Sequence, residues 1–320
     1  MKSLTLVLVA LVGPTAGSAP FADNDKAKQA EKSKAPIYDE KADAEALIRA
    51  ALGNAKKENR RVLIQWGGNW CPWCHRIHTA FKTDRELAKL LLYEYDLVLV
   101  DIGRREKNMS LAMHYGADLT KNGIPYLTVL DSDGKPLVNQ PTEPFERKSK
   151  EEKGYDTAKL AEFLNKHQPV HQEAETMLTA ALKQAAGSDK NVFLHFGAPW
   201  CGWCRHLDSW LARPDITAIV ARDFVELKID VDRMNNGQEL LKRYCASPGG
   251  IPWFVILDPH GKAIVDSVGP KGNIGFPAED HEIEHFIKMV QKTKRSMTDS
   301  DIDHLRESLV ARAKEILRKR

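Results

Sequence analysis

The chain has few cysteines, little net charge and no long hydrophobic run, and each absence narrows what the protein can be. Five cysteines in 320 residues are too few for a disulfide-stapled scaffold, which would be short and cysteine-dense. The 47 basic and 44 acidic residues leave a net charge of +3, with the two signs interspersed. This argues against a nucleic acid or an acidic membrane surface as partner. The length is enough for two domains, each with its own core.

The N-terminus has the layout of a secretory signal. Lys2 is followed by an apolar run, residues 4–12, which is too short to span a bilayer, and then by small residues up to position 22. The alternative is a hydrophobic N-terminus that frays. We expect residues 1–22 to be a signal peptide and residues 23–36 a polar linker. The mature protein would then be exported, and periplasmic or extracellular, in an oxidising compartment.

Four of the five cysteines lie in two copies of one short motif. Residues 70–74 and 200–204 both read Trp-Cys-x-Trp-Cys, and the first cysteines are 130 positions apart. Each copy follows an apolar run typical of a buried strand, residues 62–66 and 192–196. Between a strand and a helix, such a pair brings two thiols close enough to form and open a disulfide. The motif therefore predicts dithiol chemistry in both halves.

The similarity between the halves extends well beyond the cysteines. Residues 45–74 align without a gap on residues 175–204, with eleven of thirty positions identical. The match resumes at residues 123–135 and 250–262, which both begin Gly-Ile-Pro. A repeat of this length indicates a domain duplication and not a solenoid.

Each copy is predicted to run helix, strand, cysteine-motif helix, strand, helix, strand, tight turn, strand, helix. Turn residues at 131–134 and 258–261 join two strands, and the final helices are expected at 157–167 and 281–293. Strands that alternate with helices and end in a hairpin predict a mixed α/β sheet. A charged insertion in the first copy, residues 146–154, is expected to be a solvated loop.

A further helix is predicted at the C-terminus, over residues 298–320. Its acidic residues come early and its basic residues late, which suits the helix dipole. We expect this helix to pack on the second domain, with a dimer or partner contact as the alternative. Its apolar stripe is formed by Ile302, Leu305, Leu309, Ile316 and Leu317.

With these motifs in place, both halves resemble thioredoxin-fold domains, over residues 37–168 and 170–294. The resemblance is carried by the Trp-Cys-x-x-Cys after a strand and by the Gly-Ile-Pro before the next-to-last strand. The tryptophan-rich form, with His75 after the first pair, is similar to tandem thioredoxin-like proteins exported by bacteria. The resemblance implies two α/β domains, each with a mixed central sheet flanked by helices. It also implies a thiol–disulfide oxidoreductase that acts on protein disulfides.

The resemblance assigns a role to each cysteine. Cys71 and Cys201 would open their helices, where free N–H groups and the dipole favour a thiolate. The first cysteine of each pair, expected to be exposed, would attack a substrate disulfide and form a mixed disulfide. Cys74 or Cys204 would then resolve it. No cofactor is required, and the electrons would come from a separate redox partner.

The prolines of the two Gly-Ile-Pro segments would shape the substrate site. In the family this proline follows a cis peptide bond and lies against the cysteines, which implies the same for Pro125 and Pro252. The backbone edge beside it would pair with an extended substrate. The preceding residues, Ile124 and Ile251, resemble those of reducing members, so we expect reduction to be the favoured direction.

The tryptophans of the motifs are candidates for the substrate surface. Trp70 and Trp200 are expected to pack under each loop, either as plain core residues or as part of substrate binding. Trp73 and Trp203 replace the proline that the family has between the cysteines, so a redox potential does not transfer to this chain.

Two features depart from the family pattern. Six positions before the first cysteine, where thioredoxins have an acidic residue that moves protons, this chain has Gln65 and His195. His195 could relay a proton, whereas Gln65 could only hydrogen-bond, so the first site would be slower or the sites would divide their tasks. Cys245 has Gly116 as its counterpart and is either a buried inert thiol or a redox partner of the second pair.

Three other functions compete with this interpretation. Residues 71–75 fit the haem pattern Cys-x-x-Cys-His, but the second copy has Arg205 in the histidine position. Cys71, Cys74, His75 and His78 would share one helix face as ligands for zinc or copper, with a poorer set in the second copy. A non-catalytic binding module is the third, although it would not need both cysteine pairs.

Overall fold

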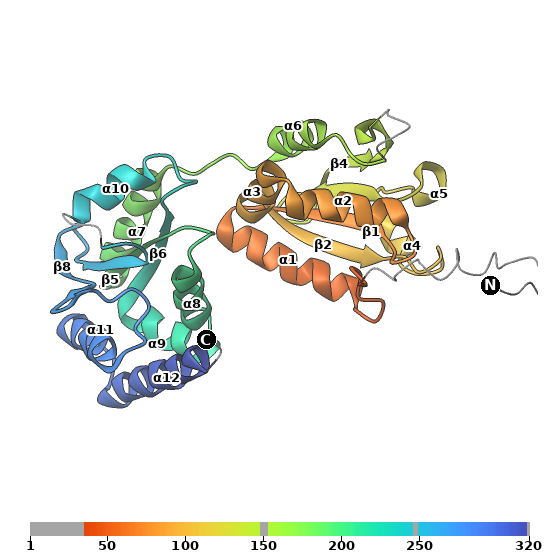
Figure 1. Ribbon diagram of the computed structural model, residues 1–320. Helices are drawn as coiled ribbons and strands as arrows, with labels where there is room; N and C mark the ends of the chain where they lie inside the picture. The colour runs from red at the N-terminus through yellow and green to blue at the C-terminus, as the bar shows by residue number, and fades with distance from the viewer. Residues whose placement is uncertain (1–34, 148–152, 246–248, 319–320) are drawn as a thin grey trace, which may run out of the picture. The chain divides into compact units, whose positions relative to one another are not determined.

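Two four-stranded sheets of the same topology organise the chain (Figure 1). The computed structural model describes residues 35–147, 153–245 and 249–318. The predicted signal peptide and nearly all of the predicted polar linker lie outside these residues. No helix among the described residues is both long and apolar enough to cross a membrane.

The first sheet has the order β2-β1-β3-β4, in which β1 and β2 are parallel and the other neighbours antiparallel. Its strands are β1 (Arg61–Gly67), β2 (Tyr95–Asp101), β3 (Tyr126–Leu130) and β4 (Pro136–Pro141). The second sheet repeats this arrangement as β6-β5-β7-β8. Its strands are β5 (Asn191–Gly197), β6 (Phe224–Asp230), β7 (Trp253–Leu257) and β8 (Ala263–Asp266). The predicted mixed sheets are confirmed.

Helices flank each sheet, and the order of elements along the chain is similar but not identical in the two halves (Figure 1). The first half has α1 (Ala44–Glu58), α2 (Pro72–Thr83), α3 (Arg85–Glu94), α4 (Met109–His114), α5 (Leu119–Asn122), the 3-10 turn η1 (Glu143–Phe145) and α6 (Thr157–His167). The second half has α7 (Ala174–Ser188), α8 (Gly202–Leu211), α9 (Pro214–Asp223), α10 (Gly237–Tyr244), the short pair β9 (Val268–Gly269) and β10 (Gly272–Asn273), α11 (Asp280–Thr293) and α12 (Asp299–Leu317).

The central strand of each sheet is buried on both faces, which explains its continuous apolar sequence. In β1, Val62, Ile64 and Trp66 face one core cluster, which includes residues of α1. Leu63 faces the other, which includes residues of α2 and α6. Because strand side chains alternate, Gln65 shares the face of Leu63. A polar side chain is thereby placed on the side of the sheet that α2 covers.

The segment between each cysteine pair and the next strand contains two helices where the sequence predicted one. In the first half the chain breaks at Asp84, whose Oδ1 accepts hydrogen bonds from the N–H groups of Glu86 and Leu87 at 3.0 and 3.1 Å. In the second half Pro214 stands at the start of α9. Both residues are common helix starters, and they were readable signals that the prediction of a single helix missed.

The C-terminal helix packs on the second domain, as expected. Ile302, Leu305, Leu309 and Ile316 of α12 join one buried cluster with Trp210 of α8 and with residues of α11. Trp210 Nε1 also donates a hydrogen bond of 2.5 Å to Ser308 Oγ. Leu317, which the predicted stripe included, is instead 54% exposed, since α12 ends there.

Asp223, at the end of α9, holds the turn that connects α11 to α12. Its buried carboxylate accepts hydrogen bonds from the backbone N–H groups of Arg295, Ser296 and Met297 at 2.8 to 2.9 Å. Burial alone would raise the pKa of Asp223, but the hydrogen bonds from Ser296, Met297 and Arg295 outweigh it and lower that pKa. The ionised carboxylate therefore stabilises the fold.

We predict that Leu305→Ala lowers the free energy of unfolding by about 2–5 kcal/mol, because it removes fully buried methyl groups and leaves a cavity. The matched control is Leu317→Ala in the same helix, whose effect should stay within about 0.5 kcal/mol. Urea unfolding of both variants measures the difference. Equal effects would show that α12 is not packed as described.

We predict that Asp223→Asn lowers the free energy of unfolding by about 1–3 kcal/mol at pH 7, because backbone donors lose a charged acceptor. The folded-state pKa of Asp223 lies below its ordinary value of 3.8, so this stability is fully present above that value. This stabilisation is lost as the pH falls through the folded-state pKa. The difference in the free energy of unfolding between Asp223→Asn and the wild type should therefore shrink there. Urea unfolding at pH 7 and pH 3 tests this, with the exposed Asp303→Asn as control. A pH-independent gap would contradict it.

Candidate active site: two cysteine pairs at helix N-termini

Each cysteine pair stands where the central strand turns into the following helix. Cys71 is the N-cap of α2, and its Sγ accepts a hydrogen bond of 3.1 Å from the N–H of Cys74. Cys201 caps α8 in the same way, with Cys204 N at 3.1 Å. The sulfur thus takes the place that a Ser or Asp oxygen usually holds at a helix start, among backbone donors that no helical carbonyl satisfies.

Both pairs are joined as disulfides. The Cα–Cα separation is 5.3 Å for Cys71 and Cys74 and 5.2 Å for Cys201 and Cys204. These separations lie in the usual range for a disulfide. Cys245 lies outside both disulfides and is buried, 5% exposed, in the core cluster on one face of the second sheet.

The expectation that the first cysteine is exposed is wrong for this disulfide form. Cys71 and Cys201 are each only 4% exposed, and their partners Cys74 and Cys204 are 0% and 2% exposed. Neighbouring loops and aromatic residues cover the sulfurs; around the first pair, Trp73 and Ile124 pack against the cluster that contains both cysteines. The first cysteine of each pair is nevertheless the less buried one.

The two predicted prolines lie beside the cysteines. The Ile124–Pro125 and Ile251–Pro252 peptide bonds are both cis, which confirms that expectation. In the second site, the carbonyl oxygen of Ile251 lies 3.4 Å from Cys201 Sγ. In each half, the structure therefore brings a disulfide together with the cis-proline loop, which comes just before the antiparallel strands β3 and β4 or β7 and β8.

The tryptophans are arranged differently from the prediction. Trp70 and Trp200 do not pack under the loops but lie on the surface, 40% and 56% exposed. Their indole N–H groups are held by surface acceptors, the carbonyl of Gly103 and, at 2.7 Å, Asp232 Oδ2. Each ring is thus partly exposed one residue before a cysteine pair, and the guanidinium of Arg104 lies over the ring of Trp70 at 5.8 Å.

The second tryptophan of each motif is the more buried one. Trp73 makes an edge contact with Tyr155, with ring centroids 5.3 Å apart. Trp203 stacks on Phe276 at 6.3 Å. These rings anchor the helix starts to loops that follow the sheets. Their predicted part in substrate binding stays a prediction.

Gln65 and His195 are both buried behind their cysteine pairs, at 0% and 1% exposure. His195 Nε2 lies 3.2 Å from Glu226 Oε1, and its Nδ1 lies 3.9 Å from Asp208 Oδ1. Burial alone would raise the pKa of Glu226, but the hydrogen bond and charge of His195 outweigh it and lower that pKa. His195 therefore connects the buried side of the second site to partly exposed carboxylates, a path along which a proton could travel.

Gln65 makes a different set of contacts. Its Nε2 donates a hydrogen bond of 2.5 Å to the phenol oxygen of Tyr38 and a longer one, 3.4 Å, to the carbonyl of Cys74. Tyr38 was not among the residues expected at the site. The aligned repeat places Pro199 opposite the neighbouring Asn69, and the same offset of 130 positions, continued toward the N-terminus, places Gln168 opposite Tyr38. These differences beside an otherwise repeated motif were the signal in the sequence that could have pointed to Tyr38.

The alternative of a metal site gains no support from the geometry. Within the part of the chain that the structure describes, no group of three or more His, Cys, Asp or Glu side chains could hold a metal ion. His75 Nε2 instead lies 2.8 Å from the carbonyl oxygen of Asn69, a backbone contact that fixes the loop before Cys71.

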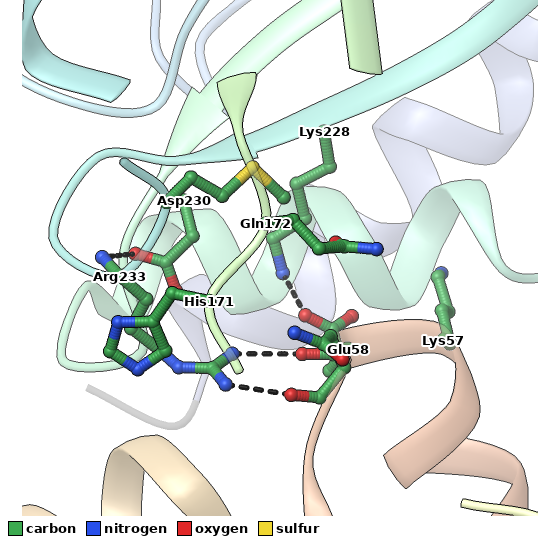
Figure 2. Close-up of a pocket in the computed structure, with 9 residues that line it drawn as sticks. Lys57, Glu58, His171, Gln172, Lys228, Asp230 and Arg233 are labelled. Carbon is green, nitrogen blue, oxygen red and sulfur yellow. Dashed lines mark hydrogen bonds and ion pairs between the residues drawn. The ribbon is translucent and has the colours of Figure 1, made fainter. Parts of the chain in front are cut away.

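A small cavity of about 40 Å³ elsewhere in the chain has no redox group (Figure 2). Several of its charged side chains are paired with one another or with backbone groups. Arg233 donates to the carbonyls of Glu58 and Asn59 at 2.8 and 2.7 Å, and Lys228 Nζ lies 2.6 Å from Glu58 Oε2. Arg233 also pairs with the buried Glu94 at 2.9 Å. We interpret this cluster as structural.

The repeated sheet order, with a disulfide at the start of the helix after each central strand and a cis-proline loop beside it, defines two thioredoxin folds in tandem. A model of the thioredoxin-like family matches residues 43–132 and 173–259, one region in each half. The chain therefore belongs to the thioredoxin-like family.

Curated relatives and solved structures resemble parts of the chain. A protein disulfide-isomerase erp38 from Neurospora crassa is 24% identical over 184 residues, which cover 55% of this chain and 45% of the relative. A protein disulfide-isomerase tigA from Aspergillus niger is 24% identical over 188 residues, covering 56% and 47%. The chain thus spans about half the length of these relatives. A disulphide isomerase structure from Xylella fastidiosa shares 28% identity, with a TM-score of 0.34, over 41% of this chain and 95% of that one.

We predict that the oxidised chain, denatured without reductant, reacts with a maleimide at Cys245 alone, because the other four thiols are consumed in two disulfides. After reduction all five cysteines should react. Mass spectrometry of the labelled peptides counts the modifications. Labelling of Cys71 or Cys201 before reduction would contradict the pairing.

Proposed function

We propose that the protein is a thiol–disulfide oxidoreductase that acts on disulfides of other proteins through two separate dithiol sites. The observation that carries this proposal is the double occurrence of one geometry: a cysteine pair at a helix N-terminus with a cis-proline loop beside it. The disulfide-isomerase names of the curated relatives are consistent with the same chemistry.

The reaction needs only the residues of the site. In the reducing direction, the thiolate of Cys71 or Cys201 attacks a substrate disulfide, forms a mixed disulfide and releases one substrate thiolate. Cys74 or Cys204 then loses its proton and attacks the first cysteine, which releases the second substrate thiolate and closes the enzyme disulfide. Two electrons pass from the enzyme dithiol to the substrate. A separate redox partner must return them, and no cofactor takes part.

The surroundings of the sulfurs suit a protein substrate. The exposed rings of Trp70 and Trp200 provide apolar contact surface next to each pair. The loops at Pro125 and Pro252 provide backbone groups beside the sulfurs, with Ile251 O already 3.4 Å from Cys201 Sγ. An extended segment that carries a disulfide could bind by backbone pairing, a common mode of peptide recognition.

The direction and the cellular setting belong to the same proposal. The isoleucines before the two prolines support a reductase, and the signal-like N-terminus supports export to the periplasm or the extracellular space. There the protein would contribute to redox homeostasis. The balanced charge supports neither nucleic-acid binding nor stable membrane insertion.

We predict that the chain accelerates the reduction of insulin disulfides by dithiothreitol, and that Cys71→Ser combined with Cys201→Ser lowers the rate to the uncatalysed level. Both nucleophiles are then lost, while a serine hydroxyl keeps the helix cap. Turbidity of the released insulin chain measures the rate. Cys245→Ser is the matched control and should keep the wild-type rate. Full activity in the double variant would refute the assignment.

The direction of each site is read from its equilibrium with glutathione. Cys201→Ser with Cys204→Ser isolates the first site, and Cys71→Ser with Cys74→Ser isolates the second. We expect each remaining pair to stay disulfide-bonded until glutathione is strongly reducing, as in a reductase, where about 30 mV corresponds to a tenfold change in equilibrium. A pair that is reduced in mildly oxidising buffer would instead indicate an oxidase.

A further inference from the structure

The short segment before α1, residues 37 and 38, is hydrogen-bonded to the loop of the first site. The backbone N–H groups of Ile37 and Tyr38 both donate to Asn69 Oδ1 at 2.9 Å, and Asn69 Nδ2 donates back to the carbonyl of Tyr38 at 3.0 Å. Asn69 lies two residues before Cys71, so these three hydrogen bonds tie the segment to the loop that carries the nucleophile. The second half has Pro199 at the corresponding position, which has no side-chain amide.

This clamp places the phenol of Tyr38 beside the buried sulfur. Tyr38 is 3% exposed and forms one buried cluster with Cys71 and Cys74. A Cβ placed on Gly67 would lie 2.3 Å from the Tyr38 hydroxyl oxygen and 2.6 Å from Cys74 Sγ. The hydroxyl oxygen and the sulfur therefore both lie beside this point, and their separation is no greater than the sum of these two distances. The site needs a glycine there because a side chain would displace one of them.

The hydrogen bonds around Tyr38 leave its own proton available. Gln65 Nε2 donates to the phenol oxygen, so the amide does not accept the phenol proton through that nitrogen. The same nitrogen also points at the carbonyl of Cys74, which fits a donor and not an amide oxygen at this position. Gln65 Oε1 is also buried and has no hydrogen-bond partner among the described residues.

Toward a thiolate of Cys74, the phenol acts as a hydrogen-bond donor. Burial raises the pKa of Tyr38, and the hydrogen bond from Gln65 offsets only part of this effect. The hydroxyl therefore stays protonated at neutral pH, and the acceptor nearest to it on the Gly67 side is the sulfur of Cys74. A thiolate is a much better acceptor than a thiol, so the interaction becomes strong when Cys74 ionises.

At the equivalent glycine of the second site, Gly197, the described residues place no such donor beside the sulfur. Within 4 Å of the point where a Cβ of Gly197 would lie, only atoms of Cys204 occur among the described residues. The buried polar residue behind that pair is His195, which faces Glu226 and Asp208. The two sites therefore differ in the group that can act on the resolving cysteine.

We propose that Tyr38 is a catalytic residue of the first site, whose hydroxyl donates a hydrogen bond to Cys74 Sγ once the disulfide opens and stabilises the thiolate that resolves the mixed disulfide. This role rests on the proposed oxidoreductase function. In the resolving step, Cys74 loses its proton to solvent and attacks Cys71 Sγ. The Cys71–Cys74 bond forms, the bond from Cys71 to the substrate sulfur breaks, and the substrate leaves as a thiolate. Tyr38 keeps its proton throughout.

The test uses the full chain with Cys201→Ser, Cys204→Ser and Cys245→Ser, so that only the first pair reacts. The reduced protein is mixed rapidly with an aromatic disulfide made of two coloured thiolates. One thiolate is released when the protein forms the mixed disulfide, and the other when that mixed disulfide is resolved. The first release reports Cys71, and the second reports resolution by Cys74. We expect Tyr38→Phe to shift the pH midpoint of the second release upward by about one unit. Below the midpoint the Cys74 thiolate is then about tenfold less populated, and resolution slows about three- to fourfold because the more basic thiolate is the better nucleophile. The midpoint of the first release should move much less.

The control is Tyr95→Phe, which removes a hydroxyl that is equally buried but bonds to the carbonyl of Leu164, remote from the sulfurs. It should leave both midpoints unchanged. Asn69→Ala, which releases the segment without altering the phenol, should move the second midpoint in the same direction as Tyr38→Phe. An unshifted second midpoint in a folded Tyr38→Phe variant would overturn the role of Tyr38. Absence of the first release in the parent chain would instead overturn the oxidoreductase function.

Discussion

The chemistry of this protein depends on one placement, a sulfur at the N-terminus of a helix. The central strand of each sheet ends at Gly67 or Gly197, and within a few residues the chain turns into α2 or α8 with a cysteine as its cap. Free backbone N–H groups converge there, as shown by the 3.1 Å hydrogen bonds to Cys71 Sγ and Cys201 Sγ. Such donors favour a thiolate, and a thiolate is what attacks a disulfide.

The burial of the cysteines increases the effect that neighbouring polar groups have on the sulfurs. All four cysteine residues are at most 4% exposed, so a polar neighbour of the sulfurs acts in a poorly hydrated environment and has a large effect. The first site has a phenol and an amide behind the resolving cysteine, whereas the second has an imidazole joined to carboxylates. The duplication thus preserved the cap and the proline loop while the buried polar environment diverged. The two cysteine pairs therefore have different buried polar neighbours.

Most of the fold and of the reacting atoms could be predicted from the sequence. Apolar runs, turn residues and the repeated motif led to the two mixed sheets, and the resemblance to a known family led to the cis prolines. The predictions failed where side-chain direction mattered. The tryptophan before each cysteine pair lies on the surface because its indole N–H finds an acceptor there. A second failure was local: Asp84, the N-cap of α3, and Pro214, the first residue of α9, were not recognised as helix starts.

The sequence by itself determined which residues are close along the chain: the cysteines three positions apart, the strand before them and the helix after them, because local propensity and spacing set those contacts. Only the tertiary structure decided what lies across from the sulfurs. Tyr38 is separated from Cys74 by a helix and a strand, and it reaches the sulfur because Asn69 binds the backbone of its segment and Gly67 has no side chain. Contacts of that kind depend on packing in three dimensions, which no local pattern encodes.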